Sequence, residues 1–158
     1  MDILFIQSSI LREMIEEELM AMQIQWYPGH MAKAQREIES KVKLVDIVIE
    51  LVDARAPFST HNPELDHMIK NKPRLYILTK KDLADPKATE ALIAEFKRQG
   101  HSAIAVDLKN FKEEKKIVNM CRYQLKDKRE KEAARGLKPK PIRALVAGIP
   151  NVGKSTFI

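Results

Sequence analysis

Four short apolar segments recur along the chain, separated by longer and more polar stretches. They occupy residues 46–54 (DIVIELVDA), 74–80 (RLYILTK), 102–107 (SAIAVD) and 142–148 (IRALVAG). The first is a nearly continuous run of Val, Ile and Leu, a pattern typical of a central strand buried on both faces of a parallel sheet. We predict that all four segments are strands.

The stretches between these segments have the features of helices. Residues 31–43 have apolar side chains at helical spacing, and residues 86–99 begin with a proline and stop before a glycine. Further helices are predicted over 64–70 and, rich in lysine and arginine, over 111–135. Strands that alternate with helices predict an α/β fold, a three-layer parallel sheet whose ligands bind at the carboxyl ends of the strands.

Residues 1–21 fit this pattern less well. They read as an apolar and acidic helix without a partner in the fold, so we expect an N-terminal extension over 1–21 and one domain over 22–158. Codons for Glu16–Glu18 can form a purine-rich repeat that resembles a bacterial ribosome-binding site just before Met22. We hypothesise that residues 1–21 are untranslated leader misread as protein, which a peptide spanning Leu11–Gln23 in mass spectrometry would contradict.

Composition narrows the class of protein. The 158 residues are 44% hydrophobic and 32% charged, which suits one globular domain. The single cysteine, Cys121, excludes an internal disulfide framework and a Cys-rich zinc site, and it fits a reducing, cytoplasmic setting. No apolar run approaches the roughly 18 residues of a membrane span.

Positive charge is concentrated in one segment. Residues 111–143 contain 12 Lys and Arg against 5 Asp and Glu, a net charge of +7, whereas the whole chain carries +6. Such a local excess favours a polyanionic partner such as nucleic acid. A solvated helix face is the alternative interpretation, and the charges alone do not separate the two.

A phosphate-loop motif, G-x-x-x-x-G-K-[ST], is matched at every fixed position by residues 148–155 (GIPNVGKS). It follows a predicted strand, which is the context that the motif requires. Its glycines let successive backbone N–H groups face one anion, Lys154 reaches the β- and γ-phosphates, and the hydroxyl of Ser155 ligates Mg²⁺. The loop leaves the base undecided between ATP and GTP.

A second motif, Thr79-Lys80-Lys81-Asp82, ends another predicted strand and has the form [NT]-K-x-D. A carboxylate there can accept hydrogen bonds from the ring N–H and the exocyclic amine of guanine, a donor pair that adenine lacks. The stem of Lys80 can lie along the purine ring or along the loop. Alone the motif is weak, since Asp82 could cap a helix, but together with a phosphate loop it indicates a guanine nucleotide.

The base motif precedes the phosphate loop by about seventy residues, the reverse of the order in common GTPases. With Trp26–Met31 (WYPGHM), Val52–Pro57 (VDARAP) and Asn62-Pro63, the two motifs resemble the circularly permuted GTPases of the YlqF/YawG type. The resemblance implies a circularly permuted P-loop GTPase domain that binds GTP or GDP. It also implies a cytoplasmic factor for late maturation of the large ribosomal subunit that contacts its rRNA, without a DNA or membrane partner.

The resemblance assigns roles to particular residues. His30 is implied as the residue that orients the attacking water, Ser155 as the Mg²⁺ ligand and Asn151 as part of a K⁺ site. The alternative for His30 is a loop histidine that hydrogen-bonds to backbone. The implied nucleotide-binding residues are Thr79, Lys80, Asp82, Asn151, Val152, Gly153, Lys154, Ser155 and Thr156.

Other positions are less specific. Trp26 and Tyr27 could stack on RNA bases or pack on the domain. Asp53 and Arg55 could form a structural ion pair or contact a ligand. The third nucleotide-contact loop is expected after strand SAIAV, where Leu108 stands in place of the usual small polar residue, so we predict no individual contact there.

The family continues past the phosphate loop with a switch loop, a D-x-P-G segment and a helical C-terminal domain, and the 158 residues contain none of these. We therefore expect a domain that is incomplete at the C-terminus, binds nucleotide weakly and hydrolyses it too slowly to be useful. By analogy with common GTPases the four strands are contiguous, which leaves strand 142–148 at an unprotected edge. A nucleotide-independent rRNA-binding fragment and an ATPase of another phosphate-loop family are the alternatives.

Overall fold

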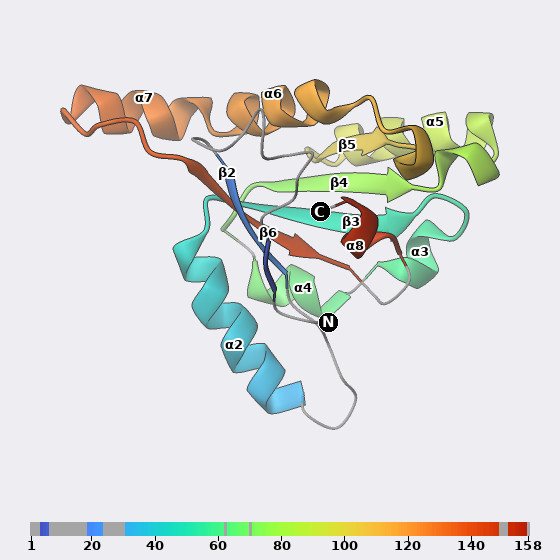
Figure 1. Cartoon of the computed structure of the whole chain (residues 1–158), viewed down its shortest axis with the longest axis horizontal. Helices are drawn as coiled ribbons and strands as arrows, with labels where there is room; N and C mark the ends of the chain where they lie inside the picture. The colour runs from blue at the N-terminus through green and yellow to red at the C-terminus, as the bar shows by residue number, and fades with distance from the viewer. Residues whose placement is uncertain are drawn as a thin grey trace.

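A parallel sheet forms the centre of the protein, as the sequence predicts (Figure 1). The computed structural model describes residues 4–6, 19–23, 31–61, 63–69, 71–148 and 152–157. Four parallel strands lie in the order β6-β3-β4-β5. Their bounds are Ile47–Asp53 for β3, Arg74–Thr79 for β4, Ser102–Ala105 for β5 and Ile142–Ala147 for β6.

The two central strands, β3 and β4, are buried along their whole length. Successive side chains alternate between two cores, as the pleat of a strand requires. Ile49 and Ile77 belong to the core on one face, whereas Val48 and Leu78 face the other side. Burial on both faces explains why these segments are nearly continuous in apolar residues.

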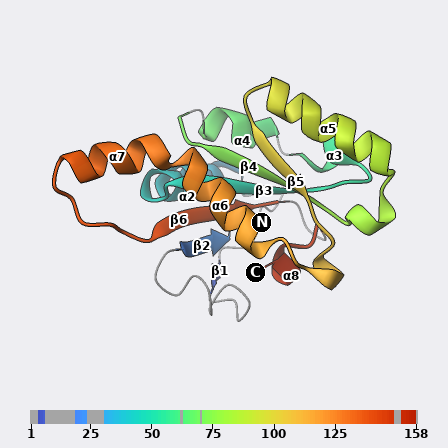
Figure 2. The same cartoon turned by 90° about the horizontal axis from the view of Figure 1, so that it is seen from above.

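Helices cover both faces and complete the predicted three layers. One face packs against α6 (Glu114–Gln124). The opposite face packs against α2 (Met31–Leu44), α4 (Pro63–Met68) and α5 (Pro86–Arg98). Figure 2 shows α6 and α5 on opposite sides of the strands. The fold class is therefore the one expected from the sequence.

Two helical regions differ from the prediction. The basic stretch forms α6 and α7 (Lys126–Ala134), which meet at Leu125, instead of one helix. The break lets α6 keep its apolar face on the sheet, while α7, which buries none of its residues, extends past the amino ends of the strands (Figure 1). The segment after β3, where the sequence predicts no helix before residue 64, contains a short helix, α3 (Pro57–Thr60), which begins at a proline.

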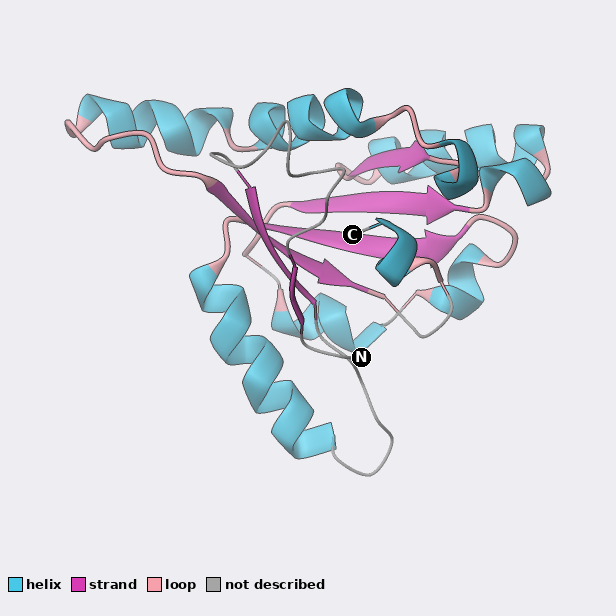
Figure 3. Ribbon diagram, in the orientation of Figure 1, coloured by secondary structure: helices cyan, strands magenta, loops and turns pink. Residues whose placement is uncertain are grey.

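The N-terminal region forms strands where the sequence predicts a helix. β2 (Leu19–Gln23) pairs in parallel with β6, and β1 (Leu4–Ile6) pairs antiparallel with β2 (Figure 3). The helix prediction is wrong at these residues, and so is the prediction that β6 is an unprotected edge. An apolar edge strand exposes unpaired backbone groups, and here an apolar segment of the same chain pairs with them. The domain boundary at residues 21 and 22 falls within β2 and stays a prediction.

The carboxyl ends of the parallel strands meet at one edge of the sheet. Asp53 at the end of β3 pairs in register with Thr79 at the end of β4. β6 and β5 run in the same direction on either side, and α8 (Lys154–Phe157) lies at this edge (Figure 1). The edge therefore gathers the loops that carry the sequence motifs.

Candidate nucleotide-binding site

The base motif and the phosphate loop are in direct contact. The hydroxyl of Thr79 donates a hydrogen bond to the backbone carbonyl of Val152 (2.6 Å) and also lies 3.3 Å from the carbonyl oxygen of Val52. Thr79 is fully buried, so water does not compete for its hydroxyl. The first bond joins residues 73 positions apart in the chain. This hydrogen bond brings the base motif and the phosphate loop, which occur in reversed order along the chain, to one site.

The two glycines of the phosphate loop are required by close packing. A Cβ on Gly148 would lie 2.8 Å from Cγ1 of Val152 and 3.1 Å from the carbonyl oxygen of Leu51. Gly153 has a φ of +109°, which side chains rarely permit, and a Cβ there would lie 2.8 Å from Cδ1 of Leu108. A side chain at Gly148 would therefore crowd the end of β3, and one at Gly153 would be strained by its backbone conformation.

The third loop reaches the same site through a residue without a predicted role. Leu108 begins the 3-10 turn η2 (Leu108–Asn110) after β5 and packs beside Gly153 and the adjoining core. Its large side chain therefore supports the phosphate loop. The next residue, Lys109, places Nζ 3.4 Å from Oδ2 of Asp82. The third loop thus contacts both other motifs.

Asp82 does not cap the helix that follows it. It lies in the 3-10 turn η1 (Lys81–Leu83) directly after β4, and its side chain is 29% exposed. The helix α5 is capped instead by Asp85, whose carboxylate accepts a hydrogen bond from the amide of Ala88 (2.7 Å). The capping interpretation of Asp82 is therefore wrong. Its carboxylate stands at the rim of the site beside Lys109.

Lys80 has an unusual backbone and a defined side-chain partner. Its φ is +58°, and no other non-glycine residue in the described part of the chain has a positive φ. Its Nζ lies 2.9 Å from Oδ2 of Asp53. The guanidinium of Arg55 donates to both oxygens of the same carboxylate, at 3.0 and 2.8 Å. The structural ion pair considered for Asp53 and Arg55 is thus present, and it extends into the base motif.

The carboxylate of Asp53 stays ionised despite its burial. The side-chain hydrogen bond from Arg55 is the largest influence, and together with Lys80 it outweighs burial and holds the pKa of Asp53 far below its usual range. Asp53 is 6% exposed. An ionised carboxylate is therefore paired with Lys80 of the base motif.

Part of the predicted site lies outside the described residues. This applies to His30, Asn151, Trp26 and Tyr27, and to the side chains of Lys154 and Ser155, whose backbone begins α8. Thr156 is exposed in the same helix. The roles that the sequence assigns to these residues stay predictions.

Packing of its last residue attaches α8 to the sheet. Phe157 is 4% exposed and belongs to the core that faces α6. Its ring meets that of Phe111 edge-on, with 5.9 Å between the ring centroids. The amide of Phe157 donates to the carbonyl of Gly153 (2.9 Å), so this contact also fixes the end of the phosphate loop.

Comparison with known proteins identifies the family. No family model matches the chain. Over 137 residues, 87% of its length, the chain is 52% identical to ribosome biogenesis GTPase A of Bacillus cereus, and it covers 46% of that protein. The chain belongs to the ribosome biogenesis GTPase A family. It is also 35% identical over 138 residues to mitochondrial ribosome-associated GTPase 1 of Mus musculus, covering 84% of this chain and 40% of that protein.

Solved structures agree with the fold. GNP-bound YlqF from T. maritima matches with a TM-score of 0.57 and 32% identity, over 79% of this chain and 46% of that one. GDP-bound YlqF gives a TM-score of 0.55 and 31% identity, over 77% and 45%. The resemblance to the YlqF/YawG family and the circularly permuted α/β fold are thereby confirmed. The chain spans about half the length of the relatives that it matches.

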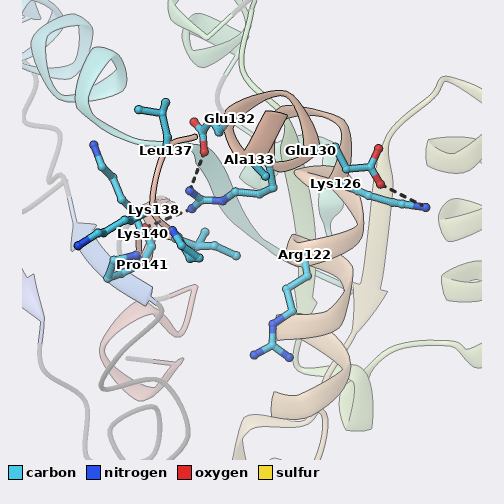
Figure 4. Close-up of a pocket in the computed structure, with 12 residues that line it drawn as sticks. Arg122, Lys126, Glu130, Glu132, Ala133, Leu137, Lys138, Lys140 and Pro141 are labelled. Atoms are coloured by element: carbon cyan, nitrogen blue, oxygen red, sulfur yellow. Dashed lines mark hydrogen bonds and ion pairs between the residues drawn. The ribbon is translucent and has the colours of Figure 1, made fainter. Parts of the chain in front are cut away.

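A basic groove lies away from the strand tips, between α7 and the segment that leads into β6 (Figure 4). Its volume is about 670 Å³. Arg129, which lines the groove, donates hydrogen bonds to the carboxylate of Glu132 (3.0 Å) and to the carbonyl of Pro141 (3.3 Å). Positive side chains outnumber negative ones in its lining, which includes Arg122, Lys126, Arg129, Lys138 and Lys140 against Glu130 and Glu132.

Proposed function

We propose that this chain forms the GTP-binding part of a ribosome assembly factor that acts late in maturation of the large ribosomal subunit. The observation that carries the proposal is the hydrogen bond from Thr79 to Val152, which joins the base motif to the phosphate loop. Asp82 follows Thr79 closely enough to read the base of a nucleotide held by that loop. The names of the relatives, ribosome biogenesis GTPase A and mitochondrial ribosome-associated GTPase 1, support the cellular role.

The proposed ligands are GTP and GDP, with Mg²⁺ on Ser155 and K⁺ beside Asn151. The tight approach of Gly148 to Val152 and Leu51 fits a loop that curls around phosphate. His30 is proposed to orient the water that attacks the γ-phosphate, and a phosphate-release assay measures the resulting turnover.

The proposed partner is the rRNA of the large subunit, bound through the basic segment 111–143. The groove beside α7 supports this, because Lys138 and Lys140 lie on the wall that faces α7 (Figure 4) and phosphate contacts account for much of RNA affinity. None of the described helices is long and apolar enough to cross a bilayer. A cytoplasmic location is proposed with the family's role.

Subunit binding tests the proposed function. Purified chain is mixed with large ribosomal subunits in the presence of a non-hydrolysable GTP analogue, GDP, an ATP analogue or no nucleotide, and co-sedimentation is measured. We expect the GTP analogue to increase binding and the ATP analogue to have no effect. Equal binding in all four samples would instead favour the nucleotide-independent rRNA-binding fragment, and a response to the ATP analogue would favour an ATPase.

Charge reversal tests the RNA surface separately. In the double variant Lys138→Glu/Lys140→Glu we expect weaker rRNA binding, with the slope of log affinity against log salt reduced by about one for each phosphate that is no longer neutralised. The matched control is Lys87→Glu/Lys97→Glu on α5, which reverses two exposed lysines on the opposite face of the sheet and changes the net charge by the same amount. An equal reduction in both variants would mean that only overall charge matters.

A further inference from the structure

We propose that Asp53 is a positioning residue for guanine binding, which acts by holding the side chain of Lys80 in place. The inference rests on the proposed guanine site and adds to it a residue outside the two nucleotide motifs. The geometry is a 2.9 Å contact between Nζ of Lys80 and Oδ2 of Asp53. It links the last residue of β3 to the base motif at the end of the neighbouring strand β4.

Asp53 is fixed from several directions. Its backbone amide donates to the hydroxyl oxygen of Thr60 (2.9 Å), and the amide of Arg55 donates to its carboxylate (2.9 Å). The hydroxyl of Thr60 in turn donates to the carbonyl of Ala56 (2.8 Å). The loop after β3 is therefore closed around Asp53, and its carboxylate has little freedom to move.

Lys80 has a flexible side chain, so a fixed ion-pair partner reduces the number of conformations that it can adopt. Its left-handed backbone turns the chain sharply from β4 into η1, and its side chain has four rotatable bonds beyond that turn. A lysine stem is useful against a purine ring only while it stays extended beside the ring. Anchoring Nζ on Asp53 removes rotamers that would otherwise have to be ordered when nucleotide binds, and such pre-organisation raises affinity.

The second cation on Asp53 has a different task. The side chain of Arg55 is 47% exposed, whereas that of Lys80 is 32% exposed. Arg55 comes from the same loop as Asp53 and makes the bidentate contact that keeps the carboxylate ionised and oriented. Among the described residues, its guanidinium bonds to Asp53, and the charge of Asp82 in the base motif also raises the pKa of Arg55. Arg55 is therefore part of the same network, and the control variant is taken from α5, where Arg98 pairs with Glu95 (2.6 Å).

A double-mutant cycle on Asp53 and Lys80 tests the inference. The variants are Asp53→Asn, which keeps the shape and removes the charge, Lys80→Ala, and the pair. We expect each single change to weaken GDP binding by about fivefold to tenfold, measured by calorimetry or with a fluorescent GDP. Because Asp53 acts through Lys80, the pair should bind no more weakly than Lys80→Ala alone.

Two further readouts separate positioning from damage to the fold. The ratio of GDP to IDP affinity should stay unchanged in Asp53→Asn, because Asp82 still reads the exocyclic amine. The control variant Arg98→Ala, which removes an exposed ion pair on α5, should keep GDP affinity within about twofold. If Asp53→Asn loses thermal stability, Asp53→Glu, which retains the charge, should restore part of the GDP affinity.

Each outcome decides a different point. Two results would overturn the positioning role alone. One is that the losses of GDP affinity in Asp53→Asn and Lys80→Ala add up in the double variant. The other is that Asp53→Asn binds GDP as tightly as the parent chain. A parent chain that shows no preference for GDP over ADP would overturn the guanine site itself, and the positioning role with it.

Discussion

β3 carries a buried aspartate at each of its ends, and the two carboxylates have different partners. Asp46, just before the amino end, is 5% exposed. It accepts hydrogen bonds from Nζ of Lys128 in α7 and from the backbone amide of Arg143 in β6 (2.9 Å). Arg129 lies 3.8 Å away. Asp46 therefore joins three elements that are distant in sequence, at the end of the sheet opposite the strand tips.

Asp53, at the carboxyl end, joins residues that are close to the nucleotide site. Its cations are Arg55 from its own loop and Lys80 from the base motif. The same residue type on the same strand is thus used once to assemble the fold and once to arrange a site. The difference lies in which side chains share the carboxylate, not in its burial.

Both carboxylates contribute stability with the same sign. For Asp46, burial alone would raise the pKa, but the hydrogen bonds from Lys128 and from the amide of Arg143 hold it below its usual value; the pKa of Asp53 is also lowered. A lowered folded-state pKa means that the contribution is present above the unfolded value of about 3.8 and is lost as pH falls through the folded pKa. At neutral pH both contributions are complete.

The largest expected effect is that of Asp46→Ala on stability. It leaves Nζ of Lys128 and the amide of Arg143 without their acceptor, so we expect the free energy of unfolding to fall by about 2–4 kcal/mol. Urea denaturation measures this. In a chain that remains folded, GDP affinity should be unchanged. If Asp46→Ala lost GDP affinity without losing stability, Asp46 would act on the site as Asp53 does, which would contradict the different roles assigned to the two carboxylates.

Thr79→Val breaks the contact between the two motifs with little change in side-chain volume. The carbonyl of Val152 loses its buried donor, which should cost about 1–2 kcal/mol of nucleotide affinity. Calorimetry with GDP measures it, and Thr89→Val on α5 is the matched control, since Thr89 is also buried and donates to the carbonyl of Asp85 (2.8 Å). Equal GDP affinity in Thr79→Val and the parent would contradict the joined site.

A third ionic cluster, midway along β3, gives the opposite pH dependence. The hydrogen bond that His61 donates to Glu50 (2.8 Å) raises the pKa of His61, against the effect of burial, and Asp66 adds to it. Stability from the charged histidine is complete below its unfolded pKa of about 6.5 and is lost as pH rises through the folded pKa. We therefore expect stability to decline as pH rises from about 6.5 through the raised folded-state pKa of His61. His61→Gln should remove this pH dependence in thermal melts.

The smallest expected effect is that of Lys128→Met. The side chain of Lys128 is 45% exposed, and Asp46 keeps the amide of Arg143, so we expect a loss of about 0.5–1 kcal/mol that shrinks as salt is added. Denaturation at low and high salt measures it. If Lys128→Met lost as much stability as Asp46→Ala, the contact with Lys128 would account for the whole contribution of Asp46.

Local sequence patterns predict the parallel sheet well. The four strands, the reversed motif order and the helix that starts at Pro86 all depend on periodicity and on residues close together in the chain. The same patterns do not reveal β2, because its apolar segment is explained as readily by a helix, and only the unpaired edge of β6 favours a strand. They also do not predict that the basic helix is interrupted at Leu125, because α6 and α7 have the same basic composition.

The site is predictable in part. Motif spacing places the base motif and the phosphate loop together, and Arg55 is foreseen as a possible partner of Asp53, but the sequence does not link Asp53 to Lys80. The ion pair with Lys80 depends on two strand ends being neighbours, which no pattern around either residue reveals. In the sequence, the size of Leu108 is only a departure from a motif, whereas in the structure its side chain packs beside Gly153. That contact depends on the path of two loops in space.

Base selectivity of the parent chain and of Asp82→Asn tests the central claim most directly. Competition of GDP, ADP and XDP against a fluorescent GDP measures it. If one nucleotide contacts both Asp82 and the phosphate loop, the parent prefers GDP over ADP by about 100-fold or more, and Asp82→Asn loses that preference and gains affinity for XDP. Equal competition by ADP and GDP in the parent, or a preference unchanged in Asp82→Asn, would contradict it.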